Sequence, residues 1–359
     1  MQPRDLSSHT PYEAGRGIEE VARELDLDPD SLVKLASNEN PLGPSPAAVE
    51  AIREHAARIH SYPKASHADL TAELAERWEL APEQVWLANG GDGALDYLAR
   101  AMLDPGDRVL VPEPGFAYYG MSARFHHGDV ETYPVSKSEA FEQTADNVLA
   151  SYDGERIVYL TSPHNPTGSE IPLSEVEELA EQVREHTLIV VDEAYGEFSD
   201  RPSAVSLVET RDNVAVLRTF SKVYGLAGLR LGYALIPETW ADAYTRVNTP
   251  FAASEIACRA GLAALSDRKH VERSIEVARD ARGYMYERLD APTWESAGNF
   301  VLAEVGDASS VANQLQQRGV IVRDCTSFGL PECIRISCGT NEEIRRAITE
   351  CNEILREGT

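Results

Sequence analysis

One lysine lies in an unusual setting, within the stretch RTFSKVYGLAGLRLG at residues 218–232. Lys222 follows Ser221, and Arg230 comes shortly afterwards among glycines. The chain has 33 lysines and arginines, of which only five are lysines. An uncharged lysine amine can bond to a carbonyl carbon, and a neighbouring cation favours that uncharged form. Chemistry that requires an amine therefore has five candidates in this chain, and Lys222 is the foremost.

A glycine-rich turn, NGGDG, follows the apolar run QVWLA and leads into a predicted helix. Free backbone N–H groups and the positive end of a helix dipole favour an anion at such a turn, typically a phosphate. Gly91, Asp92 and Gly93 would contact it, and a purely structural turn is the other interpretation. A dinucleotide fingerprint fits poorly because Asp96 stands where a small residue is needed. The lysine of a Walker loop is also missing.

Two further apolar runs end in polar residues. RIVYLT is followed by the rigid loop SPHNPTG, which presents Asn165, and TLIVV is followed by DEAY, which holds Asp192 and Tyr195. A helix cap is the alternative role for Asp192. Ligands of open α/β sheets bind beyond the carboxyl ends of the strands, where these side chains are expected. Together with Lys222 they match the needs of pyridoxal phosphate, which requires an amine for its aldehyde and an acid facing its ring nitrogen.

Short apolar runs alternate with helical stretches between residues 84 and 236. The runs are rich in Val and Leu and often continuously hydrophobic, which is typical of strands buried on both faces. Their alternation with helices such as 172–186 predicts a mostly parallel α/β sheet flanked by helices. The predicted strands are 84–89, 107–112, 156–161, 187–193, 213–219 and 231–236.

The pattern changes after about residue 250 and predicts a smaller α+β unit. The first 37 residues contain one predicted helix, 16–26, and lack a core of their own, so we expect them to pack on the small unit. The chain therefore divides into an N-terminal arm (1–37), a large domain (38–250) and a small domain (251–359). The small unit is predicted to hold helices at 254–289, 309–318 and 341–357 and strands at 299–305, 320–325 and 333–338.

Composition excludes several classes of protein. No segment approaches the ~20 consecutive apolar residues that span a bilayer, and the first residues lack the pattern of a signal peptide. A net charge of −26 would repel nucleic acid and anionic membranes. Five cysteines without CxxC pairs argue against a disulfide framework or a zinc site, so no metal is predicted. We expect a cytoplasmic protein.

The charge balance also suggests an environment. Asp and Glu number 59, and lysine is scarce. Such a surface is typical of adaptation to high salt, where screening weakens the repulsion between like charges. An ordinary acidic cytosolic protein is the alternative interpretation.

An ordered set of motifs resembles fold-type I aminotransferases, and within them the histidinol-phosphate aminotransferase branch. The resemblance runs from Tyr12 to Thr340 and implies a large pyridoxal-phosphate-binding domain with a smaller C-terminal domain. It also implies transfer of an amino group between L-histidinol phosphate and 2-oxoglutarate in histidine biosynthesis. The motifs are SNENPLGP (37–44), SYPK (61–64), SPHNPTG (162–168), DEAY (192–195), RTFSKVYGLAGLRLGY (218–233), SAGNFVL (296–302) and IRISCGT (334–340).

The resemblance implies a role for each matching residue. Lys222 would bind the aldehyde of the cofactor and later move a proton at the substrate α-carbon. Asp192 would keep the pyridine nitrogen protonated. Asn165 and Tyr195 would form hydrogen bonds to the phenolic oxygen. Phe116, in PEPGFAYY, matches the aromatic residue that stacks on the ring, although a lone aromatic is often part of a core.

Phosphate and substrate contacts follow in the same way. Arginine suits phosphate because its planar fork forms paired hydrogen bonds. Tyr62 corresponds to a tyrosine that reaches the phosphate from a neighbouring subunit, which implies a homodimer with shared active sites. The residues expected around the phosphate of the cofactor are Gly91, Asp92, Gly93, Ser221, Arg230 and Tyr62.

Two arginines, Arg323 and Arg335, occupy predicted apolar strands, where an unpaired cation is costly. They are either structural salt bridges or an anion site for the phosphate of one substrate and the carboxylates of glutamate. Tyr12 and Asn40 complete the substrate contacts that the resemblance implies. His164 departs from the usual loop sequence, and we expect it to be a loop residue rather than an acid or base.

Other functions remain open at this point. An aromatic amino-acid aminotransferase and a threonine-phosphate decarboxylase share the scaffold, and sequence does not determine which substrate bond stands perpendicular to the ring. A cofactor-binding transcription regulator is disfavoured because few residues precede the first motif and the charge opposes DNA binding. The failed glycine fingerprint disfavours a NAD dehydrogenase.

Overall fold

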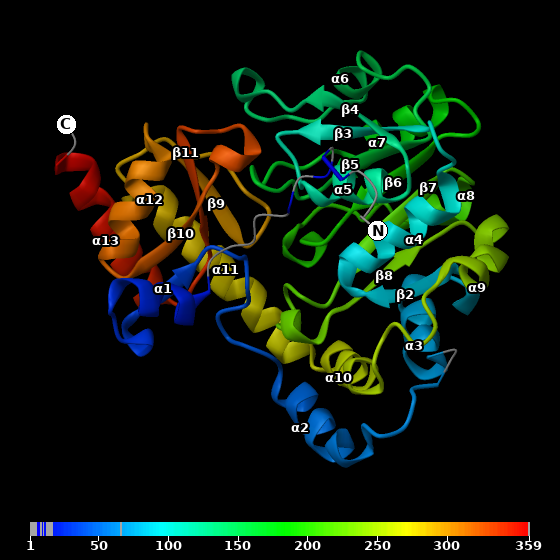
Figure 1. Cartoon of the computed structure of the whole chain (residues 1–359), viewed down its shortest axis with the longest axis horizontal. Coiled ribbons are helices and arrows are strands. Elements are labelled where there is room, and N and C mark those ends of the chain that lie inside the picture. Colours follow the sequence, from blue (N-terminus) through cyan, green and yellow to red (C-terminus); the bar gives the residue numbers. More distant parts are fainter. Residues whose placement is uncertain (1–5, 8, 10, 12–16, 65–66, 358–359) are drawn as a thin grey trace.

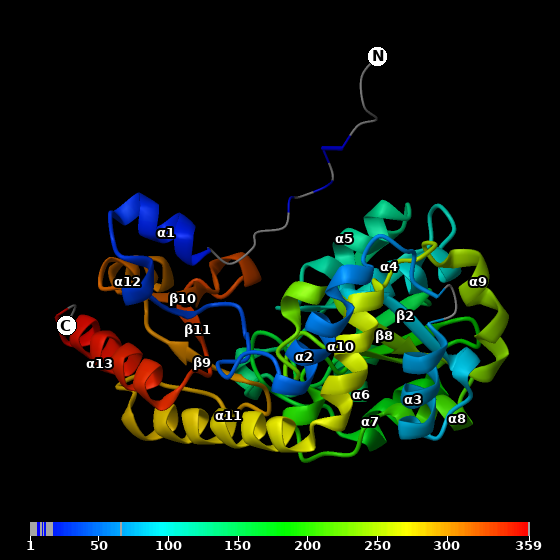
Figure 2. The ribbon, with the colours of Figure 1, turned by 90° about the horizontal axis from the view of Figure 1, so that it is seen from below.

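The computed structural model describes residues 6, 7, 9, 11, 17–64 and 67–357. Within these residues the strands form one sheet of seven strands and one of four. Figure 1 shows the two sheets side by side, and Figure 2 shows the long helix α11 (Arg268–Arg288) running beneath the smaller one toward the larger.

The large sheet has the order β2-β8-β7-β6-β5-β3-β4. Strand β8 runs antiparallel to both of its neighbours, and the other adjacent pairs are parallel. The predicted mostly parallel sheet is therefore confirmed. Its strands are β2 (Val85–Asn89), β3 (Arg108–Glu113), β4 (Asp129–Pro134), β5 (Ile157–Thr161), β6 (Leu188–Asp192), β7 (Val214–Thr219) and β8 (Leu231–Leu235).

Both faces of this sheet are covered. Along β2, Val85 and Leu87 belong to one apolar cluster, and Trp86 and Ala88 belong to a second cluster on the opposite face. Because neither face meets water, the strands are continuously apolar rather than alternating. The helices of this part are α2 (Pro46–His55), α3 (Ala68–Trp78), α4 (Gly90–Met102), α5 (Tyr118–Phe125), α6 (Ala145–Leu149), α7 (Leu173–Gln182), α8 (Val205–Thr210), α9 (Tyr244–Val247) and α10 (Glu255–Ser266).

The small sheet has the order β1-β10-β11-β9, and its first strand comes from the N-terminal segment. Strand β1 pairs in parallel with β10, with Val33 opposite Val320. The described part of the N-terminal arm from residue 17 to residue 37 therefore packs on the small sheet. Its elements are α1 (Ile18–Leu25), β1 (Val33–Leu35), β9 (Phe300–Glu304), α12 (Ala308–Gln317), β10 (Val320–Asp324), β11 (Cys333–Ser337) and α13 (Asn341–Glu357).

The prediction of a single long helix at 254–289 is wrong. It is divided into α10 and α11 at Asp267, whose side chain accepts a hydrogen bond from the backbone N–H of His270 and caps the second helix. Helix α10 packs against α2 and α3 beside the large sheet, whereas the sequence division placed it in the small unit. That domain division stays a prediction.

None of the described helices is long and apolar enough to cross a membrane. Among the described residues, no group of three or more His, Cys, Asp or Glu side chains is arranged to hold a metal ion. All five cysteines are free and buried.

Candidate active site

A cavity of about 550 Å³ lies where the carboxyl ends of β5, β6 and β7 meet the small sheet. Thr161, Asp192 and Thr219 are the last residues of these three strands, and all line it. Because β8 is antiparallel, its amino end reaches the same edge and brings Arg230 into the wall. The topology thus gathers side chains that are far apart along the chain.

Lys222 enters the cavity from the loop between β7 and β8. Its Nζ donates a hydrogen bond to the carbonyl oxygen of Ser37 at 3.3 Å and lies 5.3 Å from the centre of the Tyr195 ring. Ser221 also lines the cavity, and its Oγ accepts a hydrogen bond from Thr219 Oγ1 at 3.0 Å. An amine and a hydroxyl are therefore held next to each other on one wall.

Asp192 ends β6 as a buried carboxylate. Tyr119 Oη donates a hydrogen bond to its Oδ2 at 2.7 Å, and the backbone N–H of Ala194 donates to its Oδ1 at 2.9 Å. Burial raises the pKa of Asp192 to about 6, and these two hydrogen bonds partly oppose that shift. A cationic partner in the cavity would favour the ionised form, as a protonated pyridine nitrogen would.

The glycine-rich turn forms the first turn of α4, whose leading N–H groups have no partner within the helix. Gly90 has φ +77°, and a Cβ at this position would lie 2.5 Å from Arg230 Nη2. A side chain there would displace the guanidinium, which donates to Asp92 Oδ2 at 3.0 Å. Desolvation raises the pKa of Asp92, although Arg230 opposes that shift. The turn, Ser221 and Arg230 provide the donors that a phosphate requires.

Asn165, Tyr195 and Phe116 line the cavity near these groups. Asn165 Oδ1 accepts a hydrogen bond from Arg335 Nη1 of the small sheet. Phe116 is half-buried and packs edge-on against Tyr119, with the ring centres 5.5 Å apart. An amide, a phenol and an aromatic face are thus available to a flat ring bound beside Asp192.

The small sheet contributes Arg323 and Arg335, which are directly opposite each other on β10 and β11. Arg335 is buried, donates to the carbonyl oxygen of Ala36 at 2.8 Å and lies 5.4 Å from the Phe300 ring. Arg323 Nη2 donates to Ser327 Oγ at 2.9 Å. Like charges directly opposite in a sheet are destabilising, and an anion between them would offset the repulsion.

Comparison with known proteins identifies the family. Residues 30–350 match the family described as "Aminotransferase class I and II". The chain belongs to this family. Among its relatives, the histidinol-phosphate aminotransferase of Haloarcula marismortui is 70% identical over 357 residues, covering 99% of each chain. That of Natronomonas pharaonis is also 70% identical, over 355 residues, covering 99% of this chain and 100% of the relative.

A solved structure agrees with the sequence relatives. The histidinol-phosphate aminotransferase of Sinorhizobium meliloti, in complex with pyridoxal-5'-phosphate, has a TM-score of 0.88 at 27% identity and covers 96% of each chain. The aminotransferase fold predicted from the motifs is confirmed. The two close sequence relatives are haloarchaeal proteins, which fits the prediction of a halophilic protein from the acidic, lysine-poor composition.

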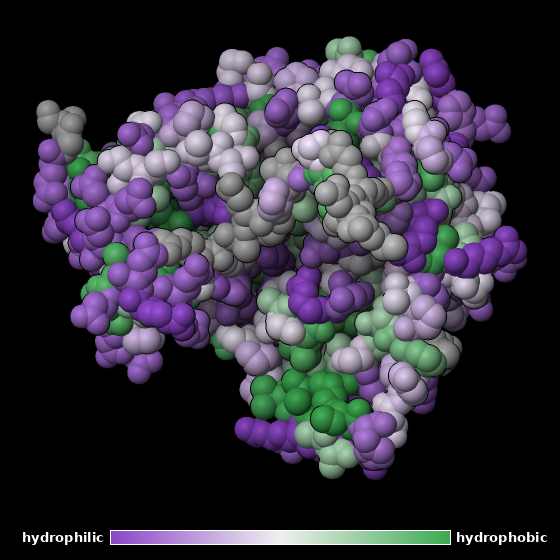
Figure 3. Space-filling view, viewed as in Figure 1, coloured by the Kyte–Doolittle hydropathy of each residue, from purple (hydrophilic) through white to green (hydrophobic). Residues whose placement is uncertain are grey.

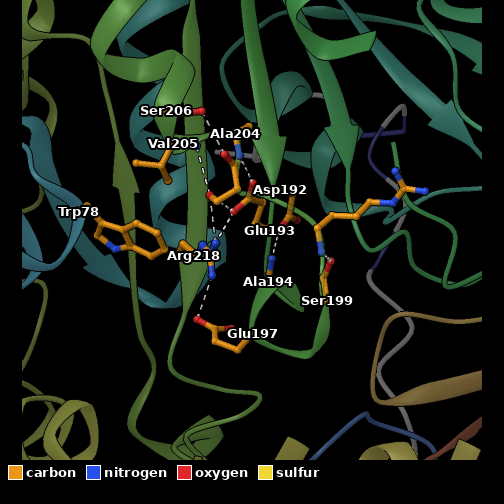
Figure 4. A network of polar contacts seen from close by, with 12 residues as sticks. Trp78, Asp192, Glu193, Ala194, Glu197, Ser199, Ala204, Val205, Ser206 and Arg218 are labelled. Carbon is orange, nitrogen blue, oxygen red and sulfur yellow. Dashed lines mark hydrogen bonds and ion pairs between the residues drawn. The ribbon is translucent and has the colours of Figure 1, made fainter. Parts of the chain in front are cut away.

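The aminotransferase holds a buried network of charges directly behind Asp192 (Figure 4). Arg218, on β7, donates to Glu193 and, at 3.1 Å, to Glu197, and its guanidinium lies 4.6 Å from the centre of the Trp78 ring. Burial raises the pKa of Glu197, and Arg218 opposes that shift. Because Glu193 follows Asp192 directly, the network ties the end of β6 to the strand that leads into Lys222.

Three predicted site residues that the structure describes are not among those that line the cavity. Asn40 donates its amide to the carbonyl oxygen of Val223 and to Ser274 Oγ, so it supports the loop behind Lys222 instead. Gly93 lies in the first turn of α4 between the lining residues Asp92 and Leu95, but it is not among them. Tyr62 is 83% exposed on the surface. Tyr12 lies outside the described residues.

Two contributors to the site were missed from the sequence. Asn38 lines the cavity and donates to Tyr195 Oη at 3.0 Å, and Tyr119 holds Asp192. Asn38 lies in the SNENP motif, and this motif was the sequence signal from which Asn38 could have been found. The prediction for His164 agrees with its position, because it is buried in its loop with Nδ1 2.8 Å from Thr167 Oγ1, and burial lowers its pKa to about 4.

Proposed function

We propose that this chain uses pyridoxal phosphate to transfer an amino group between L-histidinol phosphate and 2-oxoglutarate. The observation that carries the proposal is one cavity that combines Lys222, a buried Asp192 and a helix-end anion site with the arginine pair of the small sheet. The names of the close relatives support the choice of substrate.

The donor set fits the cofactor. The start of α4, Ser221 and Arg230 offer hydrogen bonds to a phosphate, and a side chain at Gly90, which has φ +77°, would be strained and would displace the Arg230 guanidinium from this position. Asp192 would hold a proton on the pyridine nitrogen, and Phe116 would cover one face of the ring. When bound, pyridoxal phosphate supplies an aldehyde for the amine and a ring that stabilises negative charge at the substrate α-carbon.

The chain's own residues then direct the reaction. Lys222 Nζ would hold the aldehyde of the cofactor and would move a proton at the substrate α-carbon. Asn165 and Tyr195 would donate to the phenolic oxygen of the cofactor and so orient the ring. Asp192 would keep the ring nitrogen charged without entering the proton transfer itself. Each role uses a side chain that already faces the cavity.

Arg323 and Arg335 bind the anionic groups of both substrates. Their direct opposition on β10 and β11 supports a shared site for the phosphate of histidinol phosphate and a carboxylate of glutamate. Arginine provides a planar fork that matches either group. Alternating substrates can therefore use one anion site in turn.

The functional unit is a homodimer in which Tyr62 reaches the phosphate of the neighbouring subunit. Within one chain, Tyr62 is 83% exposed, stacks on the exposed Phe251 and is not among the residues that line the cavity. Ile59 nearby is 73% exposed. Figure 3 shows an apolar patch over the adjacent helix α2. Contiguous exposed apolar surface is typical of an interface between subunits.

The site of action is the cytoplasm. The five free, buried cysteines suit a reducing compartment.

Half-reaction spectra test the substrate directly. Loaded chain is mixed separately with histidinol phosphate, phenylalanine and threonine phosphate, and loss of the visible cofactor band is followed. We expect the largest second-order rate constant with histidinol phosphate. Addition of 2-oxoglutarate should then restore the band. A faster reaction with phenylalanine would favour an aromatic aminotransferase. Release of CO₂ from threonine phosphate would favour a decarboxylase.

A further inference from the structure

We propose that Asn38 is a positioning residue that directs the hydroxyl proton of Tyr195 into the active-site cavity. This inference rests on the proposed function and concerns a residue to which the sequence motifs gave no role. Asn38 Nδ2 donates to Tyr195 Oη at 3.0 Å, and both side chains are buried.

The orientation of the Asn38 amide follows from its second partner, Ser337 on β11. The backbone N–H of Asn38 donates to Ser337 Oγ at 2.9 Å, so this oxygen acts as an acceptor there. The Ser337 hydroxyl proton is then free to reach Asn38 Oδ1, which lies 2.8 Å away. With Oδ1 accepting from Ser337, the NH₂ group of Asn38 must face Tyr195.

The direction of this hydrogen bond decides what Tyr195 can do. A phenol has one proton to donate. Because Asn38 donates to Tyr195 Oη, the Tyr195 proton is not used on that side and is available to an acceptor in the cavity. The phenolic oxygen of pyridoxal phosphate is such an acceptor. Asn38 thus acts on the cofactor through Tyr195.

The backbone at Asn38 suits this role and also suits its test. Asn38 has φ +54°, in the left-handed region, and its carbonyl oxygen accepts from Asn299 Nδ2 at 3.0 Å. Asn, Asp and Gly are the residues that adopt this conformation most readily. Asn38→Asp and Asn38→Gly therefore keep the backbone. Only Asn38→Asp reverses the hydrogen bond, because a carboxylate accepts and cannot donate.

The readout is the pH midpoint of the visible absorption change of bound pyridoxal phosphate. In Asn38→Asp, Tyr195 must donate to the new carboxylate and is lost to the phenolic oxygen. Without that donor, negative charge on the oxygen is less stable, so the midpoint rises by about one pH unit, the size expected for one hydrogen bond to a charged group. Asn38→Gly should shift the midpoint less.

A double-mutant cycle separates this effect from the added charge. Lys222 lies over the Tyr195 ring, Asp192 lines the same cavity, and Arg335 lies beside the Phe300 ring that packs on Tyr195. All three stay in every variant. In a Tyr195→Phe background there is no hydroxyl to redirect, so Asn38→Asp should shift the midpoint by less than half as much.

The proposal is supported if Asn38→Asp shifts the pH midpoint by about one unit and this shift shrinks in the Tyr195→Phe background. The proposal is overturned if Asn38→Asp shifts the midpoint equally in both backgrounds or in neither. It is also overturned if Asn38→Gly shifts the midpoint as much as Asn38→Asp does. If Asn38→Asp does not fold, Ser337→Ala releases the amide and should give a smaller shift in the same direction, and the absence of that shift counts against the proposal. An unsubstituted chain without a visible band would contradict the proposed function instead.

Discussion

At the scale of single residues, the carboxyl group of Asp192 is buried, and burial disfavours its charged form. Its pKa is about 6, above the ordinary 3.8, so the folded chain binds a proton more tightly than the unfolded chain between these values. Without cofactor, folding stability relative to Asp192→Asn should therefore fall as pH rises from about 4 through 6. The difference of about two pKa units corresponds to about 3 kcal/mol.

Denaturant unfolding of the cofactor-free chain and of Asp192→Asn across this pH range measures the difference. The variant is the matched control, because both proteins share every other titrating group. Parallel stability curves for the two proteins would show that Asp192 titrates as an ordinary exposed carboxyl.

Arg335 should serve both substrates. Arg335→Ala removes a buried cation from the anion site, and KM for histidinol phosphate and for 2-oxoglutarate should each rise roughly 10–100-fold, as expected for lost hydrogen bonds to charged groups. Arg335→Lys keeps the charge but not the planar fork and should be intermediate. Steady-state kinetics with each substrate varied in turn measures this. A change for only one substrate would contradict the shared site.

The sequence predicted residues whose own side chains suit the chemistry of the site. It did not predict residues whose role is to contact those side chains. Lys222 and Asp192 lie at or after the ends of apolar runs, Arg230 directly precedes one, and the sheet brings these strand ends together. Tyr119 and Asn38 form hydrogen bonds to Asp192 and Tyr195, which lie far along the chain. Their roles depend on three-dimensional contacts that no local pattern contains.

At the scale of elements, the Arg218 network joins the ends of β6 and β7. Arg218→Met would leave Glu193 and Glu197 buried without their cation, which costs about 3–5 kcal/mol. Arg356→Met is the control, because its pair with Asp290 is exposed and worth ~1 kcal/mol or less. Urea unfolding of the loaded proteins compares them. Equal losses in the two variants would show that the buried network adds no more than a surface pair.

Elements with a continuous apolar pattern were predictable, and edge elements were not. The predicted strands of the central sheet match β2, β3, β5, β6, β7 and β8 to within about two residues at each end. Strand β4 is an edge strand with mostly exposed side chains, so it lacks an apolar run. Strand β1 has three residues and depends on pairing with β10, nearly 300 residues later.

At the scale of the whole molecule, the proposed dimer predicts complementation. A mixed dimer of Lys222→Ala and Tyr62→Ala chains contains one site with an intact Lys222 facing an intact Tyr62. Refolding the two inactive or weakened chains together should therefore give more activity than either homodimer. Co-refolded Lys222→Ala alone is the control. Activity equal to the average of the parents would show that Tyr62 does not act across the interface.

Lys222 is proposed to hold the cofactor, and the scarcity of lysine makes this bond directly measurable. Borohydride treatment of the loaded chain makes a lysine–aldehyde bond permanent, and mass spectrometry of the digested protein then locates the attached cofactor among five lysines. We predict that the label lies on the peptide containing Lys222 and that Lys222→Ala loses both the label and the visible band. A label on Lys34, Lys64, Lys137 or Lys269, or an unchanged band in the variant, would show that another residue holds the cofactor.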